Sequence, residues 1–333
     1  MLSYNRRFNF INGPRSIGKT YTTEKYCIKR AIEKGEQFFY IVRTQYEKLN
    51  HAMEDGLAKV LDREFSNYEF KFSKGELCYK NSDQGKFITI GYCLAISESA
   101  KIRRKSFPFG KYIIFDEYML APEDSGGYVD GWKEPDKFLS IYHTIDREED
   151  RVICFFLGNN TSFYNPYHMH KSFNIPRVEP GKIWASKNVL FQYALPSDEL
   201  IAEKENSRFL SMIRGTDYAS YAITGEYVDT DTKEIMPLTK GCIHTFNFSF
   251  MGNTFGVWRY EQEGLCIISK SYDPSCPFSY ALTTSDRQEN TMFTKDKHNP
   301  HLQYMARAFK LTRIRYDSLE TKSKAEPAII MLL

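Results

Sequence analysis

The sequence predicts an α/β protein whose first part is built on a mostly parallel β-sheet. Short continuous apolar runs alternate with amphipathic segments that have helical spacing. The apolar runs end in charged or amide residues, as buried parallel strands do where ligands bind at their carboxyl ends. A glycine-rich segment, GPRSIGKT, joins the first run to the first helical segment. Together these observations favour βαβ units around a phosphate-binding loop.

The individual elements follow from the spacing of apolar residues. Apolar runs predict strands, and alternation around a Lys-Gly turn predicts a hairpin; these lie at 7–12, 37–43, 68–81 (the hairpin), 86–96, 111–119 and 151–160. Helical spacing predicts helices at 19–35, 46–65 and 134–146. Gly35 is a plausible stop for the first helix, since glycine readily adopts the left-handed conformation that ends many helices.

The pattern changes after about residue 195. Segment 197–215 has helical character, and a few short β-like runs follow a polar stretch at 229–234. We expect a first domain over 1–196, a helical linker over 197–228 and a C-terminal domain over 229–333. Segment 301–316 predicts a basic amphipathic helix, which could contact nucleic acid or form a charged outer face. Its basic residues are Arg307, Lys310, Arg313 and Arg315.

The composition limits the class of protein. Hydrophobic residues make up 42% and charged residues 26%, which is ordinary for a soluble globular chain. The net charge of +3 is too small for a general polyanion binder, so any nucleic-acid surface must be local. We expect no membrane span and no signal peptide, because no long apolar run is present. The seven cysteines never form C-x-x-C, and we expect them to be reduced thiols.

Residues 13–20 match the phosphate-loop pattern G-x-x-x-x-G-K-[ST]. Backbone N–H groups of the loop would surround the phosphates, helped by the partial positive charge of the following helix N-terminus. Lys19 would reach the β- and γ-phosphates, and the Thr20 hydroxyl would bind Mg²⁺. A glycine-proline turn before a helix is the alternative. The expected nucleotide-binding residues are Gly13, Pro14, Arg15, Ser16, Ile17, Gly18, Lys19 and Thr20.

Two carboxylates end the apolar run at 111–119. Asp116 would hold Mg²⁺ and Glu117 would polarise the attacking water. A glutamate directly after this aspartate is typical of ASCE-type P-loop ATPases, which insert one more strand between the P-loop strand and the Asp strand. No guanine-reading N-K-x-D string is present, so we expect ATP rather than GTP. Asn159, or as second choice Asn160, could sense the γ-phosphate; a turn-forming asparagine pair is the alternative.

Basic residues precede two of the predicted strands. Arg147 could enter the ATP site of a neighbouring subunit and stabilise transition-state charge. The stretch AKIRRKSFPFGK (100–111) could touch DNA phosphates or supply a second cation to that neighbouring site. Its candidates are Lys101, Arg103, Arg104 and Lys105. Arg43 and Lys48 are weaker candidates for a DNA-facing loop, and for each of these segments an ordinary solvated charge run is the alternative.

These residues resemble a known family, the DNA-packaging ATPases of φ29-like tailed phages, over nearly the whole chain. In order, the similar segments are MLSYNR, GPRSIGKT, GEQFFYIVR, IIFDEY, RVICFFLGNN with NPY, RGTDY, FGVW, EGLCII, DPS and YALTTSDRQEN. The resemblance implies an ASCE-type motor domain, a helical linker and an α+β C-terminal domain with a degenerate ribonuclease H-like fold. It identifies Arg147 with the family's trans-acting arginine and 101–105 with its second trans-acting cation.

The resemblance also implies a function and partners. It implies ATP-driven movement of double-stranded DNA into a preformed capsid, by a homopentameric ring with ATP sites at its interfaces. The ring would dock transiently on the portal of the procapsid in the host bacterial cytoplasm, with a structural packaging RNA as a bridge. Another nucleic-acid ATPase, such as a helicase, is the alternative, and a non-enzymatic protein with a decayed P-loop is a third possibility.

The C-terminal part departs from nuclease-competent relatives of this class. Segment TFGVW carries no Asp or Glu where the first metal ligand would stand. Asp273, Asp286 and Glu289 do not form a recognisable two-metal set. We therefore expect no nuclease activity, and expect this domain to bind DNA, RNA or the portal.

Overall fold

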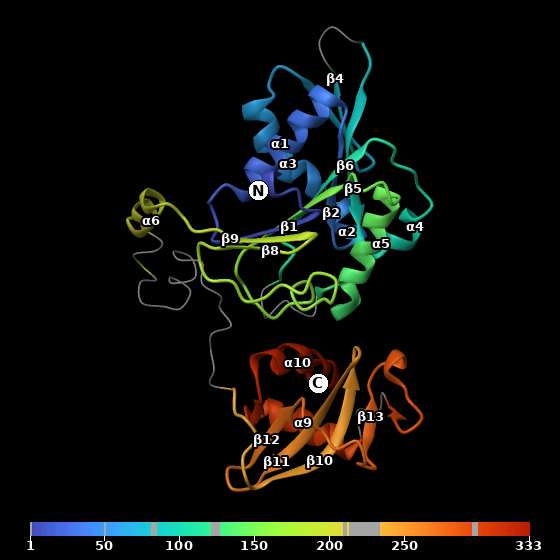
Figure 1. Ribbon diagram of the computed structural model, residues 1–333, viewed down its shortest axis with the longest axis vertical. Coiled ribbons are helices and arrows are strands. Elements are labelled where there is room, and N and C mark those ends of the chain that lie inside the picture. Colours follow the sequence, from blue (N-terminus) through green and yellow to red (C-terminus); the bar gives the residue numbers. More distant parts are fainter. Residues whose placement is uncertain are drawn as a thin grey trace. The chain divides into compact units, whose positions relative to one another are not determined.

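The computed structural model of the chain describes residues 2–49, 51–80, 85–120, 127–208, 212, 234–294 and 299–333. The chain divides into two compact units, Met1–Val228 and Asp229–Leu333 (Figure 1). The predicted linker 197–228 is described only as far as residue 208 and at 212, and it holds the short helix α6 (Asp198–Glu205).

The first unit is built on a nine-stranded sheet of order β3-β4-β5-β2-β6-β7-β1-β9-β8. The six central strands, β5-β2-β6-β7-β1-β9, all run parallel. At one edge of the sheet the β3–β4 hairpin pairs antiparallel with β5, and at the other edge β8 pairs antiparallel with β9. In chain order the strands are β1 (Phe8–Asn12), β2 (Gln37–Val42), β3 (Glu69–Ser73), β4 (Glu76–Lys80), β5 (Ile88–Ala95), β6 (Gly110–Asp116), β7 (Ile153–Gly158), β8 (Ile183–Ala185) and β9 (Val189–Tyr193).

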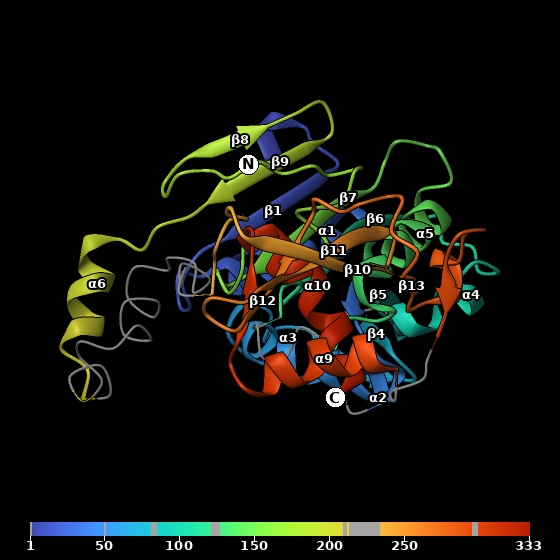
Figure 2. The same ribbon diagram turned by 90° about the horizontal axis from the view of Figure 1, so that it is seen from below.

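Helices cover both faces of this sheet (Figures 1 and 2). Apolar residues of α1 (Lys19–Lys34) and α3 (Ala52–Glu64) belong to the core on one face, and those of α5 (Glu134–Asp146) belong to the core on the other. Successive residues of a central strand alternate between the two cores; in β6, Ile113 faces α5 and Ile114 faces α1. Because both faces are buried, these strands have the continuous apolar runs from which they were predicted.

The predicted strands and hairpin of this unit are confirmed, as are the first and third helices. Helix α1 ends at Gly35, whose φ of 67° is left-handed and whose N–H donates to the Ala31 carbonyl. The single helix predicted over 46–65 is wrong: the structure has α2 (Gln45–Leu49) and then α3, with His51 in a left-handed conformation before α3. A short helix α4 (Ser99–Ile102) precedes β6.

The second unit is a six-stranded sheet with two helices against one face. The strand order is β14-β13-β10-β11-β12-β15, in which β10, β11 and β12 form an antiparallel meander. Strand β13 pairs parallel with β10, and β14 pairs parallel with β13, an arrangement that matches the expected ribonuclease H-like order. The strands are β10 (Cys242–Phe250), β11 (Asn253–Tyr260), β12 (Leu265–Ser269), β13 (Ser279–Ala281), β14 (Met292–Phe293) and β15 (Ile314–Tyr316).

In the described part of this unit, the helices are α9 (Pro300–Lys310) and α10 (Leu319–Leu332). The helix predicted over 301–316 is therefore only partly right. Thr312 has a φ of 56°, and the chain then forms β15, which pairs parallel with β12. Ile314 and Tyr316 are buried in the core at this edge, and that burial outweighs the local helical pattern.

Candidate nucleotide site

The loop 13–18 joins β1 to α1, as the phosphate-loop pattern requires. Gly18 has a φ of 81°, and a Cβ on Gly13 would lie 2.6 Å from the Ala194 carbonyl oxygen. Both positions therefore need glycine, one for its conformation and one for the close approach of the backbone. Gly18 has no side chain with which to cap α1, and the partial positive charge of the helix N-terminus favours a bound anion.

Lys19 points back into this loop. Its Nζ donates to the carbonyl oxygens of Gly13 and Pro14, at 2.9 and 2.8 Å, and to Oδ1 of Asn159 at 3.4 Å. Asn159 is partly exposed, whereas Asn160 is fully buried. The structure thus brings the first-choice asparagine to the lysine of the loop.

Asp116 and Glu117 lie at the carboxyl end of β6 with different surroundings. Burial raises the pKa of Asp116, and hydrogen bonds from Thr20 and from the Glu117 backbone partly oppose this rise. The Glu117 N–H donates to Asp116 Oδ1 at 3.0 Å, while the Glu117 side chain is exposed. The Thr20 hydroxyl and the Asp116 carboxylate are adjacent hard oxygen donors, a pair that fits Mg²⁺.

A third carboxylate, Glu24, lies behind this pair and was not predicted. It is 1% exposed, and its Oε1 has no hydrogen-bond partner among the residues that the structure describes. Burial, reinforced by the charge of Asp116, raises the pKa of Glu24 to about 8. The sequence held a signal for it, since a residue four positions after Thr20 lies on the same helix face one turn further along.

The strand order explains why these residues meet. Strand β7 lies between β1 and β6 and runs parallel to both, so the inserted strand expected from Asp116 and Glu117 is confirmed. The carboxyl ends of β1, β7 and β6 carry the P-loop, Asn159 and the two carboxylates in that order. Three segments that are far apart in the sequence therefore meet at the carboxyl ends of neighbouring strands.

Arg147 lies at the opposite end of the parallel strands, just before the amino end of β7. It ends α5 with a φ of 53°, and its guanidinium donates to the carbonyl oxygens of Thr144 (3.2 Å) and Lys105 (2.9 Å). Arg103 donates to the Ser140 hydroxyl at 2.9 Å, so the basic stretch rests on α5 beside Arg147. Strand β6 spans roughly 20 Å at ~3.3 Å per residue, which separates this cluster from Asp116 of the same chain.

The remaining residues of the basic stretch are also exposed. Lys101 forms an ion pair with Glu98 at 3.3 Å, whereas Lys105 contributes its backbone carbonyl to Arg147. Arg103, Arg104 and Lys105 all expose their side chains. Of the predicted trans-acting candidates, Arg103 thus contacts α5, and Lys105 contacts Arg147 through its backbone carbonyl.

Comparison with known proteins decides the family. The family model for the podovirus DNA encapsidation protein (Gp16) matches residues 1–329. The chain belongs to this family. The DNA packaging protein of Bacillus phage B103 is 30% identical over 321 residues, which cover 96% of this chain and 95% of the relative. That of Bacillus phage phi29 is 31% identical, covering 96% of this chain and 92% of the relative.

Solved structures give the same result. A chain of the bacteriophage Phi-29 viral genome packaging motor assembly superposes with a TM-score of 0.69 at 27% identity, covering 100% of this chain and 98% of that one. The N-terminal domain of the DNA packaging ATPase from bacteriophage phi29 superposes with a TM-score of 0.50 at 29% identity, covering 60% of this chain and 94% of that one.

The structure does not place Arg43 on a DNA-facing surface. It is 8% exposed, because its guanidinium donates to the carbonyl oxygens of Glu117 (2.9 Å) and Tyr118 (2.6 Å) and pairs with Glu134 at 3.3 Å. Burial raises the pKa of the Glu134 carboxyl, and the Arg43 charge opposes that rise. Lys48 lies in α2, but its side chain is outside the described part of the chain.

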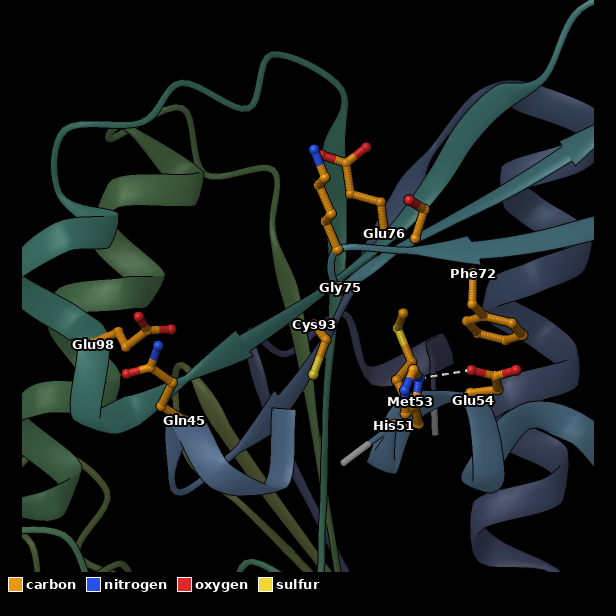
Figure 3. A pocket seen from close by; sticks show the side chains of 11 residues that line it. Gln45, His51, Met53, Glu54, Phe72, Gly75, Glu76, Cys93 and Glu98 are labelled. Carbon is orange, nitrogen blue, oxygen red and sulfur yellow. Dashed lines mark ion pairs between the residues drawn. The ribbon is translucent and has the colours of Figure 1, made fainter. Parts of the chain in front are cut away.

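A cavity of about 390 Å³ lies elsewhere in the first unit, between the α2–α3 junction, the β3–β4 turn and β5 (Figure 3). Cys93 lines it together with Phe72 and Met53, and an ion pair joins His51 to Glu54 on one wall (2.9 Å). None of the predicted nucleotide-binding residues lines this cavity. It is therefore distinct from the nucleotide site.

The C-terminal carboxylates have structural roles. Asp286 accepts hydrogen bonds from the N–H groups of Met251 and Gly252 and from the Thr283 hydroxyl, which ties the β10–β11 turn to the segment after β13. Asp273 accepts from the backbone and hydroxyl of Ser275. Among the described residues, no three His, Cys, Asp or Glu side chains gather closely enough to hold a metal ion. Glu289 is exposed.

In the described part of the chain, no helix is both long and apolar enough to span a membrane.

Proposed function

We propose that this member of the family hydrolyses ATP and uses the energy to move double-stranded DNA into a preformed phage capsid. Family membership over residues 1–329 supports the packaging role and disfavours the helicase alternative. One observation carries the ATPase assignment. Four predicted site residues meet at the carboxyl ends of neighbouring parallel strands, namely Lys19, Asn159, Asp116 and Glu117.

The chemistry is divided among these residues. The loop 13–18 and Lys19 hold the phosphates of ATP, and Asn159 senses the γ-phosphate beside the lysine. Thr20 and Asp116 would hold Mg²⁺, which neutralises charge that develops on the phosphates. Glu117, exposed at the strand end, orients and polarises the attacking water.

Arg147 completes a neighbour's site rather than its own. The cluster of Arg147 and the 101–105 stretch lies at the amino ends of the parallel strands, roughly 20 Å from Asp116 of the same chain. A cation at the amino ends of the strands can reach a bound nucleotide only in the site of a neighbouring subunit. We therefore propose a ring, pentameric by family resemblance, with ATP sites at its interfaces and Arg147 acting in trans.

Further partners are part of the same proposal. The ring docks on the portal of the procapsid in the host cytoplasm, and a structural RNA bridges the ring to the capsid. The ring contacts DNA mainly through the DNA phosphates. The C-terminal domain, 229–333, serves as a binding domain without nuclease activity. Its carboxylates Asp273 and Asp286 are engaged in turns, which supports that assignment.

The experiment that tests this function is steady-state ATPase activity on procapsids, with no added nucleic acid, with single-stranded DNA and with long duplex DNA. We expect duplex DNA to stimulate turnover and Lys19→Ala to abolish it. Stimulation by single strands alone would contradict the packaging role. Equal turnover in the Lys19→Ala variant would contradict the nucleotide site.

A further inference from the structure

The backbone of Glu117 has a conformation that side-chain-bearing residues rarely adopt. Its φ is 52°, in the left-handed region. Such a conformation persists where the surrounding structure holds it in place. On its amino side the Glu117 N–H donates to Asp116, and on its carboxyl side the Tyr118 N–H donates to the Leu157 carbonyl at 3.3 Å. The carbonyl groups of Glu117 and Tyr118 have a different partner.

That partner is Arg43, at the end of β2. Its Nη1 donates to the Glu117 carbonyl at 2.9 Å and its Nη2 to the Tyr118 carbonyl at 2.6 Å. The two bonds use the planar fork of the guanidinium, which a lysine ammonium cannot reproduce. The contacts span 74 and 75 positions of sequence.

Arg43 is itself held from several sides. Its guanidinium lies 5.1 Å from the ring centroids of both Phe115 and Tyr128, and its Nε pairs with the buried Glu134 carboxylate. Glu134 is fixed in turn by the Val129 N–H (2.5 Å) and the Tyr167 hydroxyl (2.9 Å). The arginine head therefore has little freedom to leave the carbonyl groups that it holds.

We propose that Arg43 is a positioning residue for hydrolysis: it locks the 117–118 backbone so that the Glu117 carboxylate points at the attacking water. This rests on the proposed ATPase function. Arg43 touches neither phosphate nor water in this account, so it acts only through Glu117. Its loss changes the rate of hydrolysis and leaves nucleotide binding, which uses the loop at the end of β1, nearly unchanged.

The test compares Arg43→Lys and Arg43→Gln with the wild type on procapsids with duplex DNA. We expect kcat to fall roughly 10- to 100-fold in both, as expected when a reacting group is misplaced by about 1 Å. Affinity for a fluorescent, non-hydrolysable ATP analogue should stay within roughly twofold, because the P-loop contacts are intact. Arg63→Lys, an exposed arginine of α3, is the matched control and should keep the wild-type kcat.

A double-mutant cycle separates positioning from general destabilisation. If Arg43 acts through Glu117, adding Arg43→Lys to Glu117→Gln should lower the small residual rate no further. A further fall of the same factor as in the wild-type background would overturn the proposal, and so would a wild-type kcat in Arg43→Lys. A wild type that neither binds nor hydrolyses ATP would refute the underlying ATPase function instead. If Arg43→Gln does not fold, Arg43→Lys, which keeps the charge opposite Glu134, decides the matter.

Discussion

His168 is expected to make the first unit sensitive to acid. The side chain is fully buried, with Nε2 2.7 Å from the Tyr118 hydroxyl oxygen and Nδ1 3.0 Å from the Phe163 carbonyl oxygen. The oxygen of the same Tyr118 hydroxyl lies 2.7 Å from Oδ1 of Asn12. Tyr118 follows Glu117, and Asn12 precedes the loop 13–18, so the imidazole supports both sides of the candidate nucleotide site. Burial lowers the pKa of His168 from 6.5 to about 3.

The magnitude follows from that pKa. Between pH 6.5 and 3 the unfolded chain carries the His168 proton and the folded chain does not, so stability falls as the pH falls. Each pH unit below 6.5 removes ~1.36 kcal/mol from the free energy of unfolding until the folded chain also takes up the proton. A change from pH 7 to pH 5 should therefore remove about 2 kcal/mol through this one group.

The assay is urea unfolding followed by tryptophan fluorescence at pH 7 and pH 5. His168→Gln cannot take up this proton, so its loss of stability between the two pH values should be about 2 kcal/mol smaller than that of the wild type. His143→Gln, an exposed histidine of α5, serves as the control and should lose as much as the wild type. Equal losses in the wild type and in His168→Gln would refute the reasoning, whatever the absolute stability of the variant.

Two further predictions concern the ring and the core. Arg147→Ala should abolish ATP turnover in a ring made only of that variant. Mixing Arg147→Ala subunits with Glu117→Gln subunits should restore part of the turnover, because an intact Glu117 then meets an intact Arg147 across some interfaces. Mixed rings that stay inactive would exclude action in trans. Gly91→Ala should lower the free energy of unfolding by ~1–3 kcal/mol, because the new Cβ would lie 2.6 Å from Cζ of the buried Phe38. An unchanged free energy of unfolding in urea would show that Gly91 is not packed tightly against Phe38.

Local patterns predicted much of the first unit. The P-loop, the strand that ends at Asp116 and the inserted strand β7 all follow from short runs of sequence, because strands buried on both faces are apolar throughout. The same reasoning failed where tertiary packing decides the outcome. Segment 314–316 looks helical by spacing but pairs with β12, since the sheet edge offers hydrogen bonds and a buried face.

By itself, the sequence predicted a loop of the phosphate-binding pattern, a sheet to present it and two carboxylates at the end of a neighbouring strand. These are short-range properties, expressed in residue type and spacing. Only the tertiary structure decided that Arg43 is buried beneath Glu117 and that Arg147 lies with Lys105 far from its own Asp116. Such contacts join residues 42 and 74 positions apart, and the folding of the sheet, rather than any local pattern, brings them together.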